Sequence, residues 1–248
     1  NDLIPHGLAA KLADAIEPGH VLEAVRGDAD RYVLSFRKGE AAREVRAGQV
    51  VLALPFTLLR KVKIDVELPE RKRRAIADLA YGTNAKLMIG FEQRTWRTQG
   101  ANGASMSDLA YQTTWDTSRK QAGSAGVLTN FTGGRHGAEL GQGTPKQQAE
   151  AAVRDLERVF PGIAAARGNA AEARMHWPSN PWVLGSYACL RPGDWSVLGG
   201  AVRESVGGLH FAGEHCAIEA QGFMEGGCES GELAAQAVLQ QRGIARAA

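Results

Sequence analysis

Apolar and polar residues follow one another along the chain in short blocks, and the period of each block predicts a helix or a strand. The runs His20–Val25 and Arg31–Phe36 are rich in strand-forming residues and flank a turn-forming segment, so they predict two strands. The run Gln49–Leu54 is almost continuously apolar and stops at Pro55, which is typical of a strand buried on both faces. The beginning of the chain is therefore predicted to be mostly β.

The middle of the chain carries helical patterns between strand patterns. Pro69 precedes a pattern that predicts a basic-faced helix running to about Ala80. Residues 84–91 alternate between apolar and less apolar positions with a period of two, which predicts a strand. Residues 144–147 form a capping box with proline at the first helical position, so they predict the start of another helix. This mixture predicts an α/β or α+β fold with a mixed sheet at its centre.

The composition narrows the class of protein. With 248 residues, 44% of them hydrophobic, the chain can form one large domain or two small ones around a buried core. The formal net charge of +2 argues against a dedicated nucleic-acid-binding protein and against a disordered one. No stretch of about 18 apolar residues occurs, so we expect no membrane-spanning segment. The three cysteines are few and odd in number, which indicates a reducing compartment, and we expect a cytoplasmic location.

Two further features of the sequence are unusual. Glycine accounts for 30 of the 248 residues, more than its usual share of about 7%, which suggests that the backbone approaches a ligand closely. The sequence opens on Asn1 rather than on methionine, which suggests a piece cut from a longer chain. His215 and Cys216 are neighbours but lack the spacing of metal ligands, so we expect no metal site.

Residues 209–235 (LHFAGEHCAIEAQGFMEGGCESGELAA) carry the most informative pattern. A short apolar strand leads into a Gly-Glu pair, and a helix is predicted to begin near Gly222. Gly227 and Gly231 belong to a stripe of small residues on this helix, where each glycine costs roughly 1 kcal/mol relative to alanine. We therefore expect the stripe to approach a sheet or a ligand closely. The free N–H groups at the helix start would favour an anionic group, although simple tight packing on a sheet is an equal alternative.

Several segments of the chain resemble one known protein family. FAGEH followed by QGFMEGGCESGELAA resembles the C-terminal flavin-binding motif of the flavin-dependent monoamine oxidase family. VVLALP at 50–55 and ELPERKRRAIADLAYGTNAKLMIGFEQRTW at 67–96 resemble the middle region of that family. Trp177, followed by Gly-Ser-Tyr at 185–187, fits the same pattern. The resemblance covers nearly the whole chain in the family's order, and it implies an FAD cofactor.

One part of the family pattern is missing from this sequence. The family begins with a strand and a G-x-G-x-x-G turn that hold the ADP part of FAD, and no such motif occurs here. The resemblance is therefore to the C-terminal half, and it implies that a second chain or a segment absent here carries this unit. The implied fold is part of an FAD-binding dinucleotide-type domain (residues 1–55 and 183–248) with a substrate domain, a mixed sheet covered by helices (residues 56–182).

The resemblance also implies contacts with the cofactor. Gly213 and Glu214 match the segment beside the ribityl and pyrophosphate groups, where Glu214 would accept a hydrogen bond from a ribityl hydroxyl or simply cap a loop. Gly222, Phe223 and Met224 match the helix start at the pyrimidine edge of the flavin, where the positive helix end and the Met224 N–H would stabilise negative charge.

Three more positions match cofactor contacts of the family. Trp177 matches a tryptophan beside the flavin, with an ordinary core position as its alternative. Leu22 matches a position whose backbone meets the adenine. Ser186 falls where some members carry a cysteine bonded to the flavin, and because serine cannot form that thioether, the resemblance implies noncovalent FAD.

Three residues match positions that act in catalysis. Lys86 interrupts an apolar strand, and it corresponds to the lysine that holds a water near flavin N5 and assists reoxidation by O₂. A solvated or edge position is its alternative. Tyr187 and Phe223 resemble the two-aromatic cage that guides the amine to the flavin, with phenylalanine in place of the tyrosine common at the second position.

The implied reaction is the oxidation of an amine to an imine, which hydrolyses to an aldehyde or keto product, while O₂ is reduced to H₂O₂. L-amino-acid and polyamine oxidases share the motif, and a carboxylate-gripping arginine would favour the former, with Arg174 and Arg191 as candidates. A catalytically silent fragment that binds a partner is the alternative outside enzymes.

Overall fold

The computed structural model describes residues 2–28 and 30–244, which form two compact units. The first unit combines Asn1–Ala77 with Val197–Ala248, and the second is Asp78–Ser196. The predicted boundaries followed residues 55 and 182, whereas the observed ones follow residues 77 and 196. The first boundary moves because β5 and most of α3 pack into the first unit. Helices and strands occur in both, in agreement with the predicted fold class.

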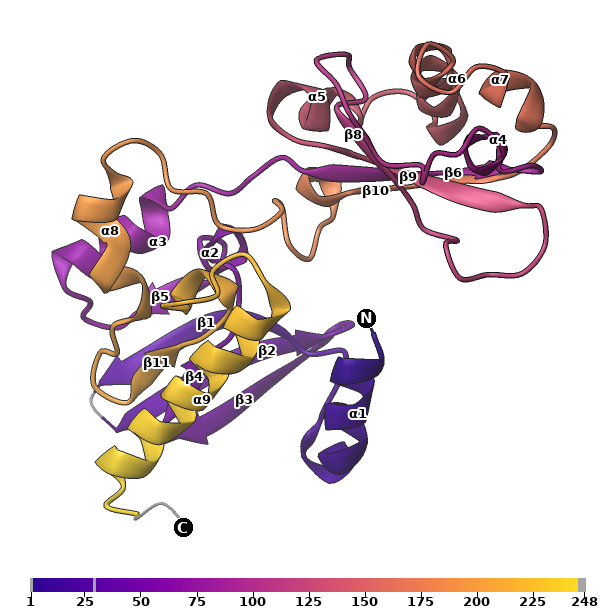
Figure 1. The fold of residues 1–248 in the computed structure, drawn as a ribbon. Coiled ribbons are helices and arrows are strands. Elements are labelled where there is room, and N and C mark those ends of the chain that lie inside the picture. The colour runs from indigo at the N-terminus through magenta and orange to yellow at the C-terminus, as the bar shows by residue number, and fades with distance from the viewer. Residues whose placement is uncertain (1, 29, 245–248) are drawn as a thin grey trace. The chain divides into compact units, whose positions relative to one another are not determined.

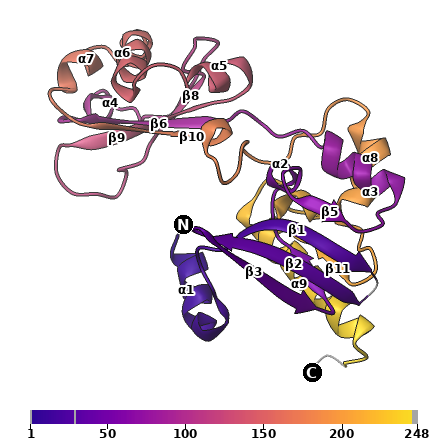
Figure 2. The ribbon, with the colours of Figure 1, turned by 180° about the vertical axis from the view of Figure 1, so that it is seen from behind.

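The first unit holds two sheets (Figures 1 and 2). Its strands and helices are β1 (Val21–Asp28), β2 (Arg31–Lys38), β3 (Ala41–Ala47), β4 (Val50–Leu52), β5 (Lys63–Asp65), β11 (Leu209–Phe211), α1 (Leu3–Lys11), α2 (Phe56–Leu59), α3 (Glu70–Asp78), α8 (Asp194–Arg203), α9 (Met224–Gln241) and the 3₁₀ turns η1 (Ala13–Ala15) and η3 (Glu214–Cys216). One sheet has the order β3-β2-β1-β5, with β5 parallel to β1, and the other is the parallel pair β11-β4.

The hairpin predicted from the first two strand patterns forms, with Val25 paired to Leu34 in antiparallel β1 and β2. The third pattern forms β4, but the prediction that both of its faces are buried is wrong, because Val51 is 44% exposed. The buried Tyr32 of β2 connects this sheet to the loop before β11, since its hydroxyl accepts a hydrogen bond from the Gly208 N–H at 3.0 Å. Helix α9 packs along β11 and η3.

A buried lysine lies at the junction of α3 and α8. The sequence predicts α3 as a helix with a basic outer face, yet Lys72 is fully buried. Its Nζ donates to the Val202 carbonyl in the last turn of α8 at 2.9 Å and lies 3.8 Å from the centre of the Phe211 ring. A cation at the carbonyl end of a helix is favourable, but burial opposes the charge. Burial lowers the pKa of Lys72 to about 8.

This lowered pKa makes the stability of the protein depend on pH. Between a folded pKa of about 8 and the ordinary value near 10.4, the unfolded chain binds more protons than the folded chain, so stability rises with pH. The free energy of unfolding, measured by urea denaturation, should rise by about 1 kcal/mol more in the wild type than in Lys72→Met between about pH 7 and pH 9. Parallel pH profiles of the two proteins would show that Lys72 does not titrate in this range.

The second unit is built on a five-stranded sheet with the order β10-β6-β9-β8-β7. Its elements are β6 (Ala85–Phe91), β7 (Ser105–Met106), β8 (Thr113–Asp116), β9 (Gly126–Thr132), β10 (Glu172–His176), α4 (Thr95–Thr98), α5 (Gly134–Glu139), α6 (Pro145–Leu156), α7 (Ile163–Ala166) and the 3₁₀ turn η2 (Trp177–Ser179). Helices α5, α6 and α7 lie on one side of the sheet in both views (Figures 1 and 2). The predicted capping box starts α6, with the Thr144 side chain accepting from the Gln147 N–H.

The alternation of β6 decides which residues meet these helices. Four of its side chains enter the core together with the stripe of α6, and they are Ala85, Leu87, Ile89 and Phe91, all at most 1% exposed. Lys86 and Met88 therefore point to the opposite side of the sheet. The strand predicted at residues 84–91 is confirmed, and it gives the sheet one covered face and one open face.

Among the residues that the structure describes, no helix is long and apolar enough to cross a bilayer, and no three metal-ligating side chains gather. Cys189, Cys216 and Cys228 all carry free thiols.

Candidate functional site

The open face of the five-stranded sheet carries one cation among apolar and aromatic side chains. Strand pairing places Lys86 opposite Phe131 of β9, Phe131 opposite Thr113 of β8, and Met175 of β10 opposite Lys86. The Lys86 Nζ lies 5.9 Å from the ring centres of both Trp115 and Phe131. Lys86 is partly buried and is the only ionisable residue among the described strand positions of this face.

This environment gives the lysine a defined position. Two aromatic rings within about 6 Å attract the ammonium through their negative faces and restrict where its Nζ lies. The aliphatic stem packs on the sheet while the head stays available for a further partner. A lysine held in this way suits the positioning of a water molecule, and it is neither a sheet-edge lysine nor part of an ion pair with the described residues.

The segment that carries Tyr187 is hydrogen-bonded to the chain just before β6. The Ser186 N–H donates to the Gly82 carbonyl at 2.8 Å, and the Gly82 N–H donates to the Tyr187 carbonyl at 2.9 Å. The Ser186 hydroxyl also donates to Asn84 Oδ1 at 2.8 Å. Because Asn84 directly precedes β6, these bonds fix the segment of Tyr187 relative to the strand of Lys86. Tyr187 itself is 41% exposed.

Trp177 follows β10, whose Met175 is paired with Lys86 of the neighbouring strand β6. Its side chain is partly buried at the start of η2, and the structure does not make it a residue of the second unit's buried core. The alternative interpretation as an ordinary core tryptophan therefore loses support, and its predicted place beside a flavin stays a prediction.

The first unit holds the predicted residues from the C-terminal motif, and the backbone at Gly213 requires glycine. Gly213 has φ +129°, and a Cβ there would lie 2.6 Å from Cε1 of His215. Its N–H donates to the Ser230 hydroxyl of α9 at 2.9 Å. This contact holds the end of β11 against the helix, and it leaves no room for a side chain on the side of His215.

Glu214 acts as a loop cap in this structure. Its Oε2 accepts a hydrogen bond from the Gly222 N–H at 2.8 Å, across the loop that leads into α9. This favours the capping alternative for that oxygen, and the bond to a ribityl hydroxyl stays a prediction.

Glu229, which the sequence pattern does not single out, closes the same loop with its carboxylate. Its two oxygens accept hydrogen bonds from the consecutive N–H groups of Ile218, Glu219 and Ala220 at 2.7 to 3.3 Å. These bonds hold the pKa of Glu229 below its ordinary value. Glu229 gave no distinguishing signal in the sequence, since Glu225 and Glu232 of the same helix are also acidic.

The start of α9 is exposed and has free N–H groups. The helix begins at Met224 with Phe223 as its N-cap, and no side chain accepts a hydrogen bond there. Phe223 is 72% exposed and Met224 49% exposed. An 18-residue helix with an uncapped N-terminus presents N–H groups and partial positive charge to an acceptor.

The close approach expected at the glycines of α9 occurs at a different residue. A Cβ at Gly227 or Gly231 would meet nothing within 4 Å, so the expected contact is absent there among the described residues. Gly226 is buried instead, and a Cβ there would lie 2.2 Å from the Ala220 carbonyl oxygen. The buried stripe of the helix therefore runs through Gly226, Ser230 and Ala234.

Leu22 lies at the start of β1, where the pairing with β2 shifts register between Leu22 and Ala24. The pairing with β5 spans Ala24–Arg26, so Leu22 precedes it. The predicted contact between the Leu22 backbone and an adenine stays a prediction.

The adjacent His215 and Cys216 are buried and uncharged at neutral pH. Burial, together with the positive charge of Lys72, lowers the pKa of His215 to about 4, and burial raises the pKa of the Cys216 thiol to about 12. A neutral imidazole packed 4.6 Å from the ring of Phe56 and a protonated thiol serve the core of the unit. Neither side chain is suited to nucleophilic chemistry.

Comparison with known proteins defines the class. Residues 1–239 match the family described as flavin containing amine oxidoreductase. Among curated relatives, an L-amino acid dehydrogenase of Synechocystis sp. is 28% identical over 95% of this chain and 49% of its own length. A flavin-containing amine oxidase of Danio rerio is 27% identical over 95% of the chain and 45% of its own length. The chain thus spans about half the length of these relatives.

Solved structures show the same fold. Cyclohexylamine oxidase from Brevibacterium oxydans IH-35A matches with a TM-score of 0.81 and 24% identity over 96% of this chain and 52% of that one. Putrescine oxidase bound to putrescine matches with a TM-score of 0.82 and 20% identity over 93% of this chain and 51% of that one. The chain belongs to the flavin-containing amine oxidoreductase family, and it has the fold of about half of such a protein.

Proposed function

We propose that this chain is the C-terminal part of an FAD-dependent amine oxidase, and that it acts with a G-x-G-x-x-G unit carried by another segment or a second chain. The observation that carries the proposal is the open sheet face on which the Lys86 Nζ lies 5.9 Å from the ring centres of both Trp115 and Phe131, in a chain of the flavin-containing amine oxidoreductase family. Such a face suits a substrate cavity, because it is apolar enough to exclude water and keeps one oriented cation.

The two-stranded sheet of the first unit supports the need for a further segment. Parallel sheets normally have both faces covered and contain more than two strands. Here β4 and β11 pair only with each other among the described residues, and Val51 of β4 is 44% exposed. Additional strands and helices of a dinucleotide-binding unit would extend and cover this sheet.

The residues of the first unit fit a flavin. The uncapped N-terminus of α9 offers N–H groups to an electron-rich carbonyl or an anionic ring edge, and the Met224 N–H is among them. The side-chain-free backbone at Gly213 suits close approach to a ribityl or pyrophosphate group. We propose Gly213, Glu214, Gly222, Phe223 and Met224 as flavin-binding residues, with Leu22 and Trp177 as further contacts.

When bound, the flavin would accept a hydride equivalent from the carbon next to the amine nitrogen. In the proposed mechanism, the residues of this chain bind, orient and exclude water. Tyr187 and Phe223 present aromatic faces that admit a neutral amine and keep water away, and the helix start at Met224 stabilises negative charge at the flavin edge. Lys86 would hold a water molecule beside the bound cofactor, where its charge would favour the reaction with O₂.

The substrate class is proposed to be a simple amine. A carboxylate-binding arginine would favour an amino acid as the substrate, but both candidate arginines already bind other groups of the chain. Arg174 lies on the helix-covered face, where Nη1 donates to the carbonyls of Leu140, Gln142 and Gly143. Arg191 forms an ion pair with Asp194 at 3.0 Å and donates to the Asp78 carbonyl. An arginine in the remaining part of the protein would restore the amino-acid alternative.

H₂O₂ production tests the proposed activity. The chain, coexpressed with the segment that supplies the G-x-G-x-x-G unit, is assayed with a primary amine, a polyamine and an L-amino acid. We expect peroxide with the primary amine. Peroxide with only one of the other two substrates would reassign the substrate class. Flavin reduction without peroxide would show that O₂ is not the acceptor, and no reduction by any amine would support a silent, partner-binding fragment.

The flavin should be held without a covalent bond. Ser186 forms a hydrogen bond with Asn84 and has no thiol with which to bond the flavin. Acid precipitation of the assembled protein should therefore release the yellow colour into the supernatant. Colour that stays in the pellet would contradict this prediction and point to another residue as the attachment site.

A cytoplasmic location is part of the same proposal. It rests on the three free thiols, Cys189, Cys216 and Cys228, of which the first and last are exposed. Exposed unpaired cysteines are typical of a reducing compartment.

A further inference from the structure

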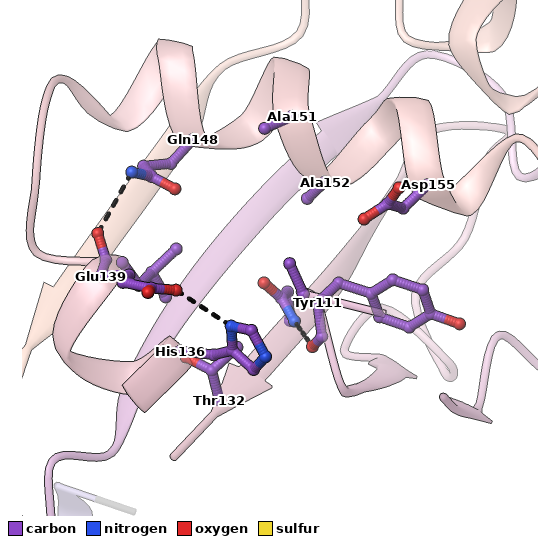
Figure 3. A pocket seen from close by; sticks show the side chains of 11 residues that line it. Tyr111, Thr132, His136, Glu139, Gln148, Ala151, Ala152 and Asp155 are labelled. Carbon is purple, nitrogen blue, oxygen red and sulfur yellow. Dashed lines mark hydrogen bonds and ion pairs between the residues drawn. The ribbon is translucent and has the colours of Figure 1, made fainter. Parts of the chain in front are cut away.

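Lys72 is a buried ionisable side chain that the proposed function does not use. An ionisable group that leaves bulk water normally lies beside one that can carry the opposite charge. One such pair lines a small cavity bounded by α5, α6 and β9, where the Glu139 carboxylate lies 3.0 Å from Nδ1 of His136 (Figure 3). Lys72 is fully buried, and its Nζ contacts a carbonyl and an aromatic ring instead of a carboxylate.

The ionisable groups around Lys72 leave most of the cost of burying its charge uncompensated. Glu204, just after α8, favours the charge, but its carboxylate is paired with Arg71 of α3. His215 and Cys216 of η3 are uncharged at neutral pH. Burial is therefore the largest influence on the lysine and lowers its pKa to about 8. Because an apolar side chain would fill the same space at a lower cost, the charge calls for a role other than packing.

The contacts of Lys72 reach both ends of the loop Gly213–Cys216. Its ammonium lies 3.8 Å from the centre of the ring of Phe211, which is the last residue of β11 and stands two residues before the loop. Its hydrogen bond to the Val202 carbonyl, at 2.9 Å, shares that oxygen with the Cys216 thiol, which donates to it at 3.7 Å. Lys72 therefore links the strand before the loop to the turn η3 at its end.

Phe56 packs against the same two segments. Its ring meets the Phe211 ring edge-to-face at 6.1 Å and the His215 ring at 4.6 Å, measured between ring centres. The His215 ring in turn occupies the space beside Gly213, where a Cβ would lie 2.6 Å from its Cε1. Because packed side chains transmit displacement, a shift of Phe211 reaches the backbone at Gly213 through these rings.

We propose that Lys72 is a positioning residue of the loop Gly213–Cys216. Its ammonium holds the Phe211 ring and the end of α8, and so keeps the backbone at Gly213 and Glu214 in the conformation that receives the flavin. A cation–π contact is stronger when it is desolvated, so the burial that makes the charge costly also strengthens its hold on the ring. This inference rests on the proposed function, in which the loop contacts the cofactor.

The effect on the loop can be measured on the full chain without flavin. The NMR shifts of the Val202 and Gly213 carbonyl carbons are followed from about pH 6.5 to about pH 9.5. We expect both to titrate with a midpoint at about pH 8, because the loss of charge at Lys72 weakens its hold on the ring as the pH rises. The titration should be absent in Lys72→Met and present in Lys61→Met, which removes an exposed lysine of the same unit.

Phe211→Leu separates the charge from its effect on the loop. Leucine keeps an apolar side chain under the ammonium and removes the ring face that attracts it. The Val202 shift should still titrate in this variant, because Lys72 still donates to that carbonyl. The Gly213 shift should follow the titration by less than about half of its wild-type amplitude.

The affinity for FAD is measured by flavin fluorescence on the assembly with the G-x-G-x-x-G segment. At about pH 7, the Kd of Lys72→Met should be about tenfold above that of the wild type. The wild-type Kd should rise about tenfold between about pH 7 and about pH 9, and that of Lys72→Met should not, although both share any titration of the flavin. The urea midpoint of Lys72→Met at neutral pH should be no lower than that of the wild type. A role in packing alone would lower this midpoint without changing the pH profile of binding.

The outcomes separate this proposal from the proposed function. A Gly213 shift that stays constant over the pH range in the wild type would overturn it, even if Lys72→Met does not fold. An FAD affinity of Lys72→Met equal to that of the wild type would also overturn it, and Lys72 would then be a structural residue only. If the Gly213 shift titrates as expected and no assembly binds FAD, the link between Lys72 and the loop stands and the proposed function is contradicted instead.

Discussion

In Lys86→Met, reoxidation of the reduced flavin by O₂ should be about 100-fold slower than in the wild type, while reduction by the amine changes by no more than about twofold. The structure supports this division, because the Lys86 ammonium lies 5.9 Å from the centres of two aromatic rings on the open sheet face. Methionine keeps the length of the side chain and removes the charge and its N–H groups. Stopped-flow absorbance measures both half-reactions separately.

The matched control for this experiment is Lys120→Met, since Lys120 is an exposed lysine of the same unit outside the strands of the sheet. Both rates should stay at wild-type values in the control. Equal slowing of reduction and reoxidation in Lys86→Met would show that the lysine shapes the whole cavity, and it would remove its assigned role with O₂.

Gly213→Ala should destabilise the first unit by at least about 2 kcal/mol and reduce flavin retention at least about tenfold. The cause is twofold, since φ at Gly213 is +129° and the new Cβ would lie 2.6 Å from His215. The buried His215 ring would have to move to admit the new side chain. Urea unfolding and flavin absorbance after gel filtration measure the two effects.

Gly231→Ala is the control for the glycine effect, because a Cβ there meets nothing within 4 Å and alanine favours a helix by roughly 1 kcal/mol. This variant should be as stable as the wild type or more so. If Gly213→Ala unfolds at the wild-type urea concentration, the backbone at Gly213 is not constrained as the structure shows. If Gly231→Ala instead loses flavin once the G-x-G-x-x-G unit is present, the predicted close approach at this glycine stripe is made by that unit.

Much of the local structure follows from periodicity in the sequence. The strands β1, β2 and β6 and the capped helix α6 were predicted from residue patterns, because each buries one face and its apolar residues repeat with the matching period. In β6 the same period placed Lys86 opposite the buried side chains, which is why this residue could be singled out before its surroundings were known.

Other elements gave no such signal. The central strand β9 contains buried polar residues, Asn130 and Thr132, whose environment comes from the cavity and from β8 rather than from the strand itself. The burial of Lys72 depends on the carbonyl end of α8, which is more than a hundred residues away in sequence. Tertiary contacts of this kind override local pattern, and a single sequence does not contain them.

The candidate site was predictable only where a family resemblance supplied it. Periodicity and helix-end rules indicate an exposed helix start near Gly222 and a cation on a strand, yet neither points to a flavin by itself. Glu229 could not be predicted in this way, because the loop N–H groups that it binds lie nine to eleven residues earlier and are brought to it by the packing of α9 on η3.

The amount of flavin bound when the missing unit is supplied tests the central claim most directly. The chain is purified alone and after coexpression with the segment that carries the G-x-G-x-x-G turn, and the visible absorbance of oxidised flavin is measured per chain. The proposed function predicts a colourless chain alone and a yellow assembly with one flavin per chain that is bleached by an amine without oxygen. A stable assembly that stays colourless, or a bound flavin that no amine bleaches, would contradict it.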